Sequence, residues 1–406
     1  MSKVNLLRRF WRLLIEENYE SLFEEIEASA SPEPRSPEGE EWLFLRAMAQ
    51  WRTGRLEDAA RSLESLVSIN SQSVSALQQL GNVYDELEQF DKAEAAYAKA
   101  HALAPDYGAV LVDWGIMLCR SGEHEEALER FEEAERLCAD DDNLYLYRGS
   151  SLESLGEFED ARDSFEEYLA RGRRDAFALG RLGVVYSELG QFDEAESVLR
   201  EAIEEQPDEL DHQYNLAMCL RLAGHYDEAR DAAEKLTREH PENAAYWGLM
   251  GDIALELREL DEARIYYSRS LDINPHESYS ISGLGWRAYY QDDFREAERL
   301  AREALVGMPG NSSALELLRV LHGPREGLHR FSVEICGELI EGVRFFKSMD
   351  CLAVTEDEAE SYVRGIQAVF DQEAWWDIEE IERAEPVQDE CPGICWISDY
   401  DIVEGE

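Results

Sequence analysis

Hydrophobic and small residues recur along the middle of the chain in the pattern of paired amphipathic helices. Within residues 76–106, the first stretch places its apolar or small positions three or four residues apart, at Leu77, Leu80, Gly81 and Tyr84. The second stretch does the same at Ala93, Tyr97 and Ala100. Such spacing puts side chains on one face of a helix. Pro105 supplies no N–H group and ends the second helix. The pattern therefore predicts a helix–turn–helix.

The same pattern returns every 34 residues, so that eight copies fit residues 40–311 without insertion or deletion. Each copy has a small residue on its first helix: Ala47, Gly81, Gly115, Gly149, Gly183, Ala217, Gly251 and Gly285. Each also has an alanine on its second helix, at Ala59, Ala93, Ala127, Ala161, Ala195, Ala229, Ala263 and Ala297. We expect the two small residues of each copy to meet where its helices approach.

Turn residues mark the junctions between the predicted helices. Five copies place a glycine where the first helix ends and a positive φ is favourable, at Gly54, Gly122, Gly156, Gly190 and Gly224. Five copies end in a proline, at Pro105, Pro207, Pro241, Pro275 and Pro309. Two helices joined by a short turn are therefore expected in each copy.

These eight copies resemble the tetratricopeptide repeat family, whose unit is a 34-residue helix–turn–helix. The aromatic residue of the family's opening Trp-x-x-Leu-Gly motif is mostly replaced, for example by Leu77 and Leu111. The resemblance implies a mainly α fold, an α-solenoid that forms a right-handed superhelix. It also implies a non-enzymatic scaffold for protein–protein interaction, with a partner peptide or helix bound in the concave groove of the first helices.

The flanking regions differ from the repeats. Residues 1–28 are expected to form an N-terminal helical cap, with a membrane-surface helix as the alternative, and residues 29–39 form a Pro-rich linker. Residues 312–324 begin another first helix without a second one, and are expected to be a capping helix and linker.

Residues 325–406 change to a two-residue period, with Phe331, Val333 and Ile335 alternating with polar residues. A capping box at Thr355 and Glu358 predicts one helix, and further strand-like runs surround it. We therefore predict a small α+β domain after the α-solenoid.

The charge of the chain limits its partners. Its 89 acidic and 39 basic residues give a formal net charge of −50 over 406 residues. This field repels nucleic acid and anionic membranes. Only 5 of the basic residues are lysine, a composition that suits either a salt-rich cytoplasm or a host with arginine-biased codons. The odd number of cysteines, 7, favours reduced thiols and a cytoplasmic location. We expect a monomer.

The resemblance assigns the fifth, ninth and twelfth positions of each first helix to ligand contact. This stripe is more apolar than the overall charge would suggest, and arginines near it (Arg120, Arg148, Arg181 and Arg221) are candidates for partner carboxylates. The alternative is that these residues pack between repeats. The candidate partner-binding residues are Tyr147, Arg181, Tyr214, Met218, Arg221, Trp286, Tyr289 and Tyr290.

Some members of the family clamp a peptide carboxylate with lysine, asparagine and arginine in this groove. The matching positions here hold Gln78, Asn82 and Asp113, of which only the asparagine fits and the aspartate has the wrong sign. We therefore do not expect that type of clamp.

The sequence offers little support for catalysis or cofactors. Cys336, Cys351, Cys391 and Cys395 could together hold zinc, but they include no Cys-x-x-Cys pair, so neither a metal nor a cofactor is expected. No nucleophile elbow, phosphate loop or His-Glu-x-x-His motif occurs. The remaining alternative is an effector or immunity-like inhibitor, whose acidic C-terminal domain carries the activity while the repeats select the target.

Overall fold

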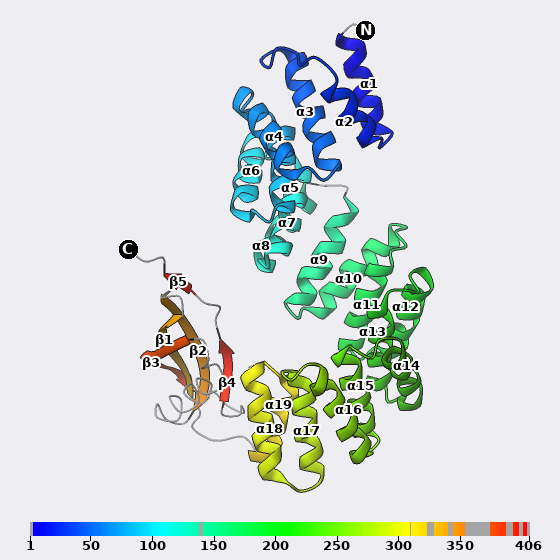
Figure 1. Ribbon diagram of the computed structural model, residues 1–406, viewed down its shortest axis with the longest axis vertical. Helices are drawn as coiled ribbons and strands as arrows, with labels where there is room; N and C mark the ends of the chain where they lie inside the picture. Colours follow the sequence, from blue (N-terminus) through cyan, green and yellow to red (C-terminus); the bar gives the residue numbers. More distant parts are fainter. Residues whose placement is uncertain are drawn as a thin grey trace. The chain divides into compact units, whose positions relative to one another are not determined.

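The computed structural model describes residues 3–137, 141–308 and 310–322, together with strands within residues 329–403 (Figure 1). Side chains are described for residues 5–137, 141–308 and 310–321. The chain forms two compact units, Met1–Asp208 and Glu209–Glu406, which we call unit 1 and unit 2. Repeats one to five fall in unit 1, and repeats six to eight fall in unit 2.

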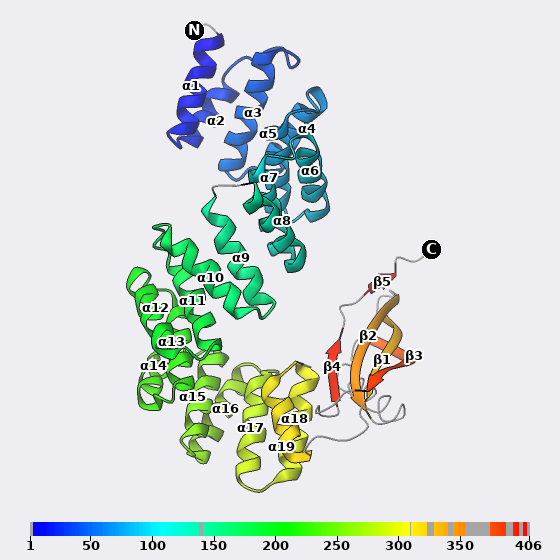
Figure 2. The same cartoon turned by 180° about the vertical axis from the view of Figure 1, so that it is seen from behind.

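Unit 1 consists of helix pairs stacked in chain order (Figure 2). Its helices are α1 (Lys3–Ile15), α2 (Tyr19–Glu27), α3 (Pro37–Arg52), α4 (Leu56–Ile69), α5 (Val74–Glu86), α6 (Phe90–Leu103), α7 (Gly108–Ser121), α8 (His124–Arg136), α9 (Asp142–Ser154), α10 (Phe158–Ala170), α11 (Ala176–Glu188) and α12 (Phe192–Glu205). Several begin at a side-chain cap: Ser73, for example, accepts a hydrogen bond from the backbone N–H of Ala76. Local sequence thus sets where these helices begin.

Unit 2 continues the same helical pattern and adds a sheet. Its helices are α13 (Leu210–Leu222), α14 (Tyr226–Glu239), α15 (Ala244–Glu256), α16 (Leu260–Ile273), α17 (Ser278–Tyr290), α18 (Phe294–Gly307) and α19 (Ser312–His322). Its strands are β1 (His329–Leu339), β2 (Arg344–Ala353), β3 (Ala374–Pro386), β4 (Gly393–Ile397) and β5 (Asp401–Val403).

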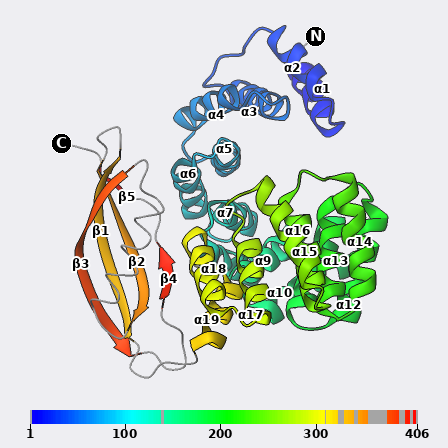
Figure 3. The same cartoon turned by 60° about the horizontal axis from the view of Figure 1, so that its bottom comes forward.

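The strands pair antiparallel in the order β3-β1-β2-β4, with β5 also pairing with β2 (Figure 3). Val333 of β1 lies opposite Met349 of β2 and Ile381 of β3. The helix predicted after Thr355 lies outside the described residues, so the small α+β domain stays a prediction.

The two helices of each repeat pack against each other. Within each unit, every second helix also contacts the first helix that follows it, and several neighbouring first helices, such as α5 and α7, contact each other. A Cβ atom at Gly81 would lie 2.5 Å from the ring of Tyr97, sixteen residues later. The tightest contact of Gly81 is therefore with the side chain one helical turn beyond Ala93, which is itself fully buried. In the eighth repeat, a Cβ atom at Gly285 would lie 3.4 Å from the carbonyl oxygen of Ala297, the alanine expected there.

The same contact recurs through the repeats, because the spacing of sixteen residues is preserved. It joins a glycine to a large side chain in five repeats: Gly81 to Tyr97, Gly115 to Phe131, Gly149 to Phe165, Gly183 to Leu199, and Gly251 to Tyr267. The absence of a side chain on the first helix thus makes room for a ring or a leucine of the second. Close packing of this kind tolerates little added volume.

The turn inside each repeat has a left-handed residue at the fifteenth position. Five repeats use the glycines expected there, whereas three use Glu88, Arg258 and Asp292, with φ angles of 57°, 64° and 60°. A non-glycine residue in this conformation carries backbone strain. The turn geometry is therefore retained even where the sequence lacks a glycine.

The first hairpin packs onto the repeats in the manner of a further pair. Helix α1 begins 34 residues before α3, and α1 and α2 both contact α3. Phe10, Leu22 and Leu45 lie in their shared core, and Trp11 stacks on Phe44 with ring centroids 6.1 Å apart. Within the described residues, we find no helix with the length and apolar character needed to cross a membrane.

Candidate partner-binding site

We call the fifth, ninth and twelfth positions of the first helices, with the side chains that contact them, the first-helix surface. In unit 1, polar contacts tie this surface together around α5. Gln78 Nε2 donates a hydrogen bond to Asp113 Oδ2 of α7 at 2.7 Å. The hydroxyl of Tyr97 donates to Asn82 Oδ1 at 2.6 Å. The first contact links the second and third repeats, and the second contact joins the two helices of the second repeat.

Burial raises the pKa of the Asp113 carboxyl, while hydrogen bonds from Gln78 and Asn82 act in the opposite direction. Burial also raises the pKa of Asp85, and the nearby Arg120 guanidinium partly offsets this rise. Arg120 Nη1 donates to Asp85 Oδ2 at 2.8 Å. The surface thus holds carboxylates whose charged forms are only partly stabilised.

The four arginines predicted to receive partner carboxylates each lie close to a carboxylate of their own unit. In addition to the Arg120 contact, Arg148 lies 3.2 Å from Glu135 and Arg181 lies 2.7 Å from Glu153. Arg221 Nη1 lies 3.9 Å from Glu256. Their first role in the structure is therefore to pair with these acids, and a partner carboxylate would have to compete for them.

Tyr147 and Arg181 are the two candidate partner-binding residues of unit 1, and their surroundings are similar. Burial raises the pKa of Tyr147, whose carbonyl accepts a hydrogen bond from Cys119 Sγ at 3.7 Å. Burial raises the pKa of Glu153 to about 6, although Arg181 lowers it. Tyr147 and Arg181 thus both lie in half-buried polar surroundings.

In unit 2, Tyr214, Met218 and Arg221 lie half-buried on α13. The Tyr214 ring lies 5.7 Å from that of Tyr246, and burial raises the pKa of Tyr214 to about 12. The positive charge of Arg221 also acts on Asp252, which accepts a hydrogen bond from the Tyr267 hydroxyl at 2.7 Å. Here the buried carboxylate has both a hydroxyl donor and a cation near it.

The predicted residues Trp286, Tyr289 and Tyr290 do lie together, at the C-terminal end of α17. The ring centroids of Trp286 lie 5.7 Å from Tyr289 and 6.0 Å from Tyr290. The indole N–H of Trp286 donates to the carbonyl and the hydroxyl of Ser313, each at 3.1 Å. Trp286 therefore anchors α19 to α17, and its ring is only partly available to a partner.

Two residues that the sequence analysis did not predict, Phe294 and Arg258, lie beside these rings. Phe294, at the start of α18, lies 5.7 Å from Tyr289 and is 50% exposed. The Arg258 guanidinium lies 3.5 Å from the ring centroid of Tyr290, which is 37% exposed. The aromatic residue at the position of Phe294 recurs in other repeats, and that recurrence was the available signal. We call Trp286, Tyr289, Tyr290 and Phe294 the aromatic cluster.

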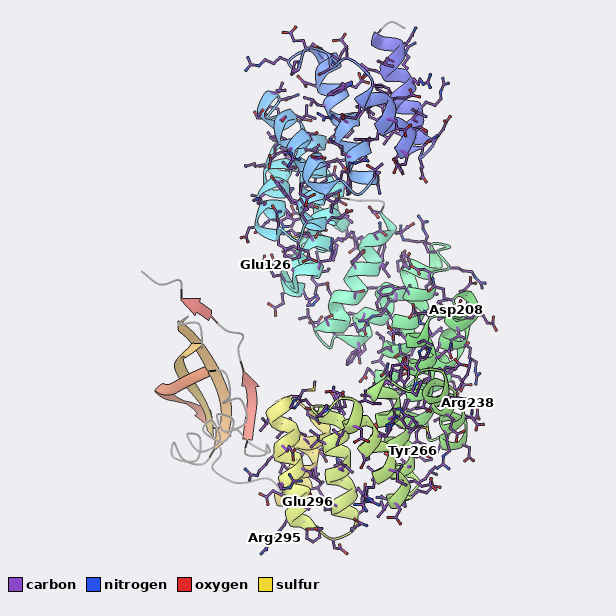
Figure 4. All side chains as sticks on the ribbon, viewed as in Figure 1. Glu126, Asp208, Arg238, Tyr266, Arg295 and Glu296 are labelled. Atoms are coloured by element: carbon purple, nitrogen blue, oxygen red, sulfur yellow. The ribbon has the colours of Figure 1, made fainter. Side chains whose placement is uncertain are left out.

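Charge separates the two sets of helices in the third to fifth repeats. Helices α8, α10 and α12 carry 17 acidic and 4 basic residues, whereas the first helices α7, α9 and α11 carry 4 acidic and 3 basic ones. In unit 2, the second helices α14, α16 and α18 carry 11 acidic and 8 basic residues. Figure 4 labels Glu126 on α8, and Arg238 and Arg295 on α14 and α18. The first helices of the third to fifth repeats are thus nearly neutral in a strongly acidic chain.

No group of three or more metal-ligating side chains occurs among the described residues. The side chains of the four C-terminal cysteines considered for zinc are not among those described, so that alternative lies outside the described part of the chain.

The fold is that of a helical-repeat protein, a class that serves as a scaffold for protein–protein interaction. Five family models described as tetratricopeptide repeat match the chain, so the chain belongs to the tetratricopeptide repeat family, which confirms the resemblance. The matches cover residues 43–65, 74–107, 112–178, 146–209, 186–253, 220–280 and 279–307. Proteins of this family are generally non-enzymatic and bind protein or peptide partners.

Solved structures similar to this chain include other tetratricopeptide repeat proteins. PilF of Pseudomonas aeruginosa has 18% identity and a TM-score of 0.46 over 52% of this chain and 95% of its own. PilW, a type IV pilus biogenesis factor, has 18% identity and a TM-score of 0.47 over 51% and 96%. YrrB, which has an unusual peptide-binding site, has 19% identity and a TM-score of 0.32 over 54% and 96%. No curated protein matches the sequence significantly.

Proposed function

We propose that the first-helix surface binds a segment of a partner protein, either an extended peptide or a helix. The observation that supports this most is the aromatic cluster of unit 2. Its four rings contact one another, and the two outer ones, Tyr290 and Phe294, are 37% and 50% exposed. Exposed aromatic side chains held rigidly by their neighbours are the typical anchors of protein interfaces.

The near-neutral charge of α7, α9 and α11 supports the same proposal. A partner segment that lies along these helices meets a weaker negative potential than it would on α8, α10 and α12, and Tyr147 and Arg181 would add polar contacts to it. In unit 2, apolar side chains of a partner segment would pack on the aromatic cluster, and on Tyr214 and Met218 of α13, with Arg221 as a polar contact. Each arginine would share a carboxylate of the partner with the acid that it already pairs with.

The test is to compare partners recovered by cross-linking and mass spectrometry from the native host. We expect the double variant Tyr290→Ala and Phe294→Ala to lose partners that the wild-type protein retains. Tyr279→Ala is the matched control, because Tyr279 lies on the same helix, is 47% exposed and belongs to no ring contact of the aromatic cluster. Retention of every partner by the double variant, or equal loss by the control, would contradict the proposal.

The effector or immunity-like alternative places the activity in residues 325–406. It stays a prediction, because the side chains that would carry it lie outside the described part of the chain. The right-handed superhelix, the monomeric state and the cytoplasmic location also stay predictions.

A further inference from the structure

Asp113 is a half-buried carboxylate that no cation of the chain compensates. Its only side-chain donors in the described structure are the neutral amides of Gln78 and Asn82, and no described lysine, arginine or histidine pairs with it. The charges that act on it, from Asp85 and Asp141, are also negative. By contrast, Asp85, Glu153 and Asp252 each have an arginine near them.

A second carboxylate on the same surface is only half satisfied. Asp85 is 7% exposed, and Arg120 donates to its Oδ2 atom. Its Oδ1 atom is buried and has no hydrogen-bond donor among the described residues. A buried charged acceptor without a donor is costly. The side chain thus has one acceptor to offer to a ligand that brings a donor.

Together, these groups form a site of negative charge. Asp85, Asp113 and Asp141 contribute three carboxylates. The charge of Arg120 acts on Asp85 and that of Arg173 acts on Asp141, whereas Asp113 has no such cation among the described residues. Asn82 and Asp85 lie on one face of α5, with Asp113 held beside Asn82. A carboxylate-binding clamp at these positions needs positive charge, so the sign here is reversed.

We propose that this part of the first-helix surface, between α5 and α7, binds a basic side chain, lysine or arginine, of the partner segment. The proposal rests on the proposed function and adds the chemistry of one partner residue. The cation contacts Asp113 first, because Asp113 is partly exposed and has no cation of its own. Contact with Asp85 Oδ1 follows when Arg120, whose side chain is 40% exposed, turns aside.

The test uses the full-length protein and three fluorescein-labelled nonapeptides that share leucines at three positions. Two further positions hold lysine in the first peptide, glutamine in the second and glutamate in the third. We expect the lysine peptide to bind wild-type protein at least tenfold more tightly than the glutamate peptide at 150 mM salt. Asp113→Asn should weaken lysine-peptide binding about 5- to 10-fold, and Asp85→Asn should weaken it about 2- to 3-fold. These changes are smaller than those measured for fully desolvated interfacial charge pairs, because this surface is partly exposed.

Glu86→Gln is the matched control, because Glu86 is exposed and is the immediate neighbour of Asp85 on α5. Glu86→Gln removes one negative charge from α5, the helix that carries Asp85, and should change binding of the lysine peptide less than twofold. Asp113→Asn keeps an oxygen that accepts from Gln78, so its thermal midpoint should be unchanged or higher. Lost binding with retained stability separates a ligand contact from a structural role.

Three results would overturn the inference. They are no binding of the lysine peptide up to 1 mM, tighter binding of the glutamate peptide, and equal weakening by Glu86→Gln and Asp113→Asn. The last would indicate attraction by the overall charge alone. If the Tyr290 and Phe294 double variant loses native partners while Asp113→Asn keeps them, the proposed function stands and this inference fails.

Discussion

Units 1 and 2 pack a tyrosine ring against a glycine in the same way, but they place the nearby carboxylate differently. Tyr97 and Tyr267 occupy the same repeat position, five repeats apart, and each ring lies against a glycine of its own first helix. The hydroxyl of Tyr97 donates to an amide, Asn82, whereas that of Tyr267 donates to a carboxylate, Asp252. The two networks therefore share their geometry and differ in charge.

The first helix of the following repeat, α7 in unit 1 and α17 in unit 2, also differs between the two units. In unit 2, the residue that faces the Tyr267 ring from α17 is Gly283, and any Cβ atom there would clash with the ring. The equivalent residue in unit 1 is Asp113, which has amide donors and no cation. In unit 2, Arg221 partly offsets the effect of burial on Asp252, whereas no described cation of unit 1 does so for Asp113.

The largest loss of stability should come from a substitution that fills the space occupied by the ring of Tyr97 or Tyr267. Gly251→Ala places a Cβ atom 2.5 Å from the Tyr267 ring and should lower the free energy of unfolding by about 2–3 kcal/mol. Gly248→Ala, one helical turn away, places its Cβ atom 3.1 Å from Ser280 Oγ and 3.9 Å from Ser270 Oγ, and no ring is nearby. It should cost little or gain up to about 1 kcal/mol from helix propensity. Urea denaturation measures both, and equal costs would contradict the packing described here.

The next prediction compares how much the hydroxyl groups of Tyr267 and Tyr97 contribute to stability. Tyr267→Phe removes a donor from a buried carboxylate and should cost about 2 kcal/mol, because hydrogen bonds to charged groups are the stronger ones. Tyr97→Phe removes a donor from an amide and should cost about 1 kcal/mol. The difference between the two variants in urea denaturation is the quantity to measure. A larger cost for Tyr97→Phe would reverse the comparison.

A pH titration examines the carboxylates of unit 1. Burial raises the pKa of Glu153 from 4.5 to about 6, so the folded state holds a proton between these values that the unfolded state has released. Stability should therefore rise as the pH falls from 7 through 6 towards 4.5, by about 1–2 kcal/mol for this group. Glu153→Gln should lose that part of the pH dependence. Identical pH profiles for the two proteins would show that Glu153 is not the cause.

The two aspartates should respond to neutralisation with opposite signs. Asp252→Asn weakens the interactions with Tyr267 and Arg221 and should cost about 1 kcal/mol. Asp113→Asn removes a charge that lacks a cation and should gain up to about 1 kcal/mol. Thermal denaturation in the absence of any partner measures both changes. A loss of stability in Asp113→Asn would mean that its charge is compensated within the protein.

Much of the fold followed from the 34-residue period, because one repeat fixes its helices and neighbours only have to stack. The small residue of each first helix and the five glycine turns were apparent in the sequence, whereas the left-handed Glu88, Arg258 and Asp292 were not. The contact from Gly81 to Tyr97 was not apparent either, since periodicity gives the face of a helix but not which turn of the next helix lies opposite.

The candidate site was less predictable for the same reason. The ties from Gln78 to Asp113 and from Asp85 to Arg120 each span 35 residues, one more than the period. They depend on how far one repeat is rotated against the next, and a repeating pattern carries no information on that angle. The exposure of Phe294 also depends on tertiary packing, because equivalent aromatic residues in earlier repeats are half-buried.

The smallest predicted effect concerns the left-handed turns, where Glu88 of unit 1 and Arg258 of unit 2 replace glycine. Glu88→Gly should relieve backbone strain and stabilise unit 1 by about 0.5–1 kcal/mol. Arg258→Gly relieves similar strain but removes the guanidinium that lies over the Tyr290 ring, an interaction worth about 0.5–1 kcal/mol. Its net effect should be close to zero, whereas partner binding through the aromatic cluster should weaken. A clear stabilisation by Arg258→Gly with unchanged partner binding would show that the stacked arginine has no part in the interface.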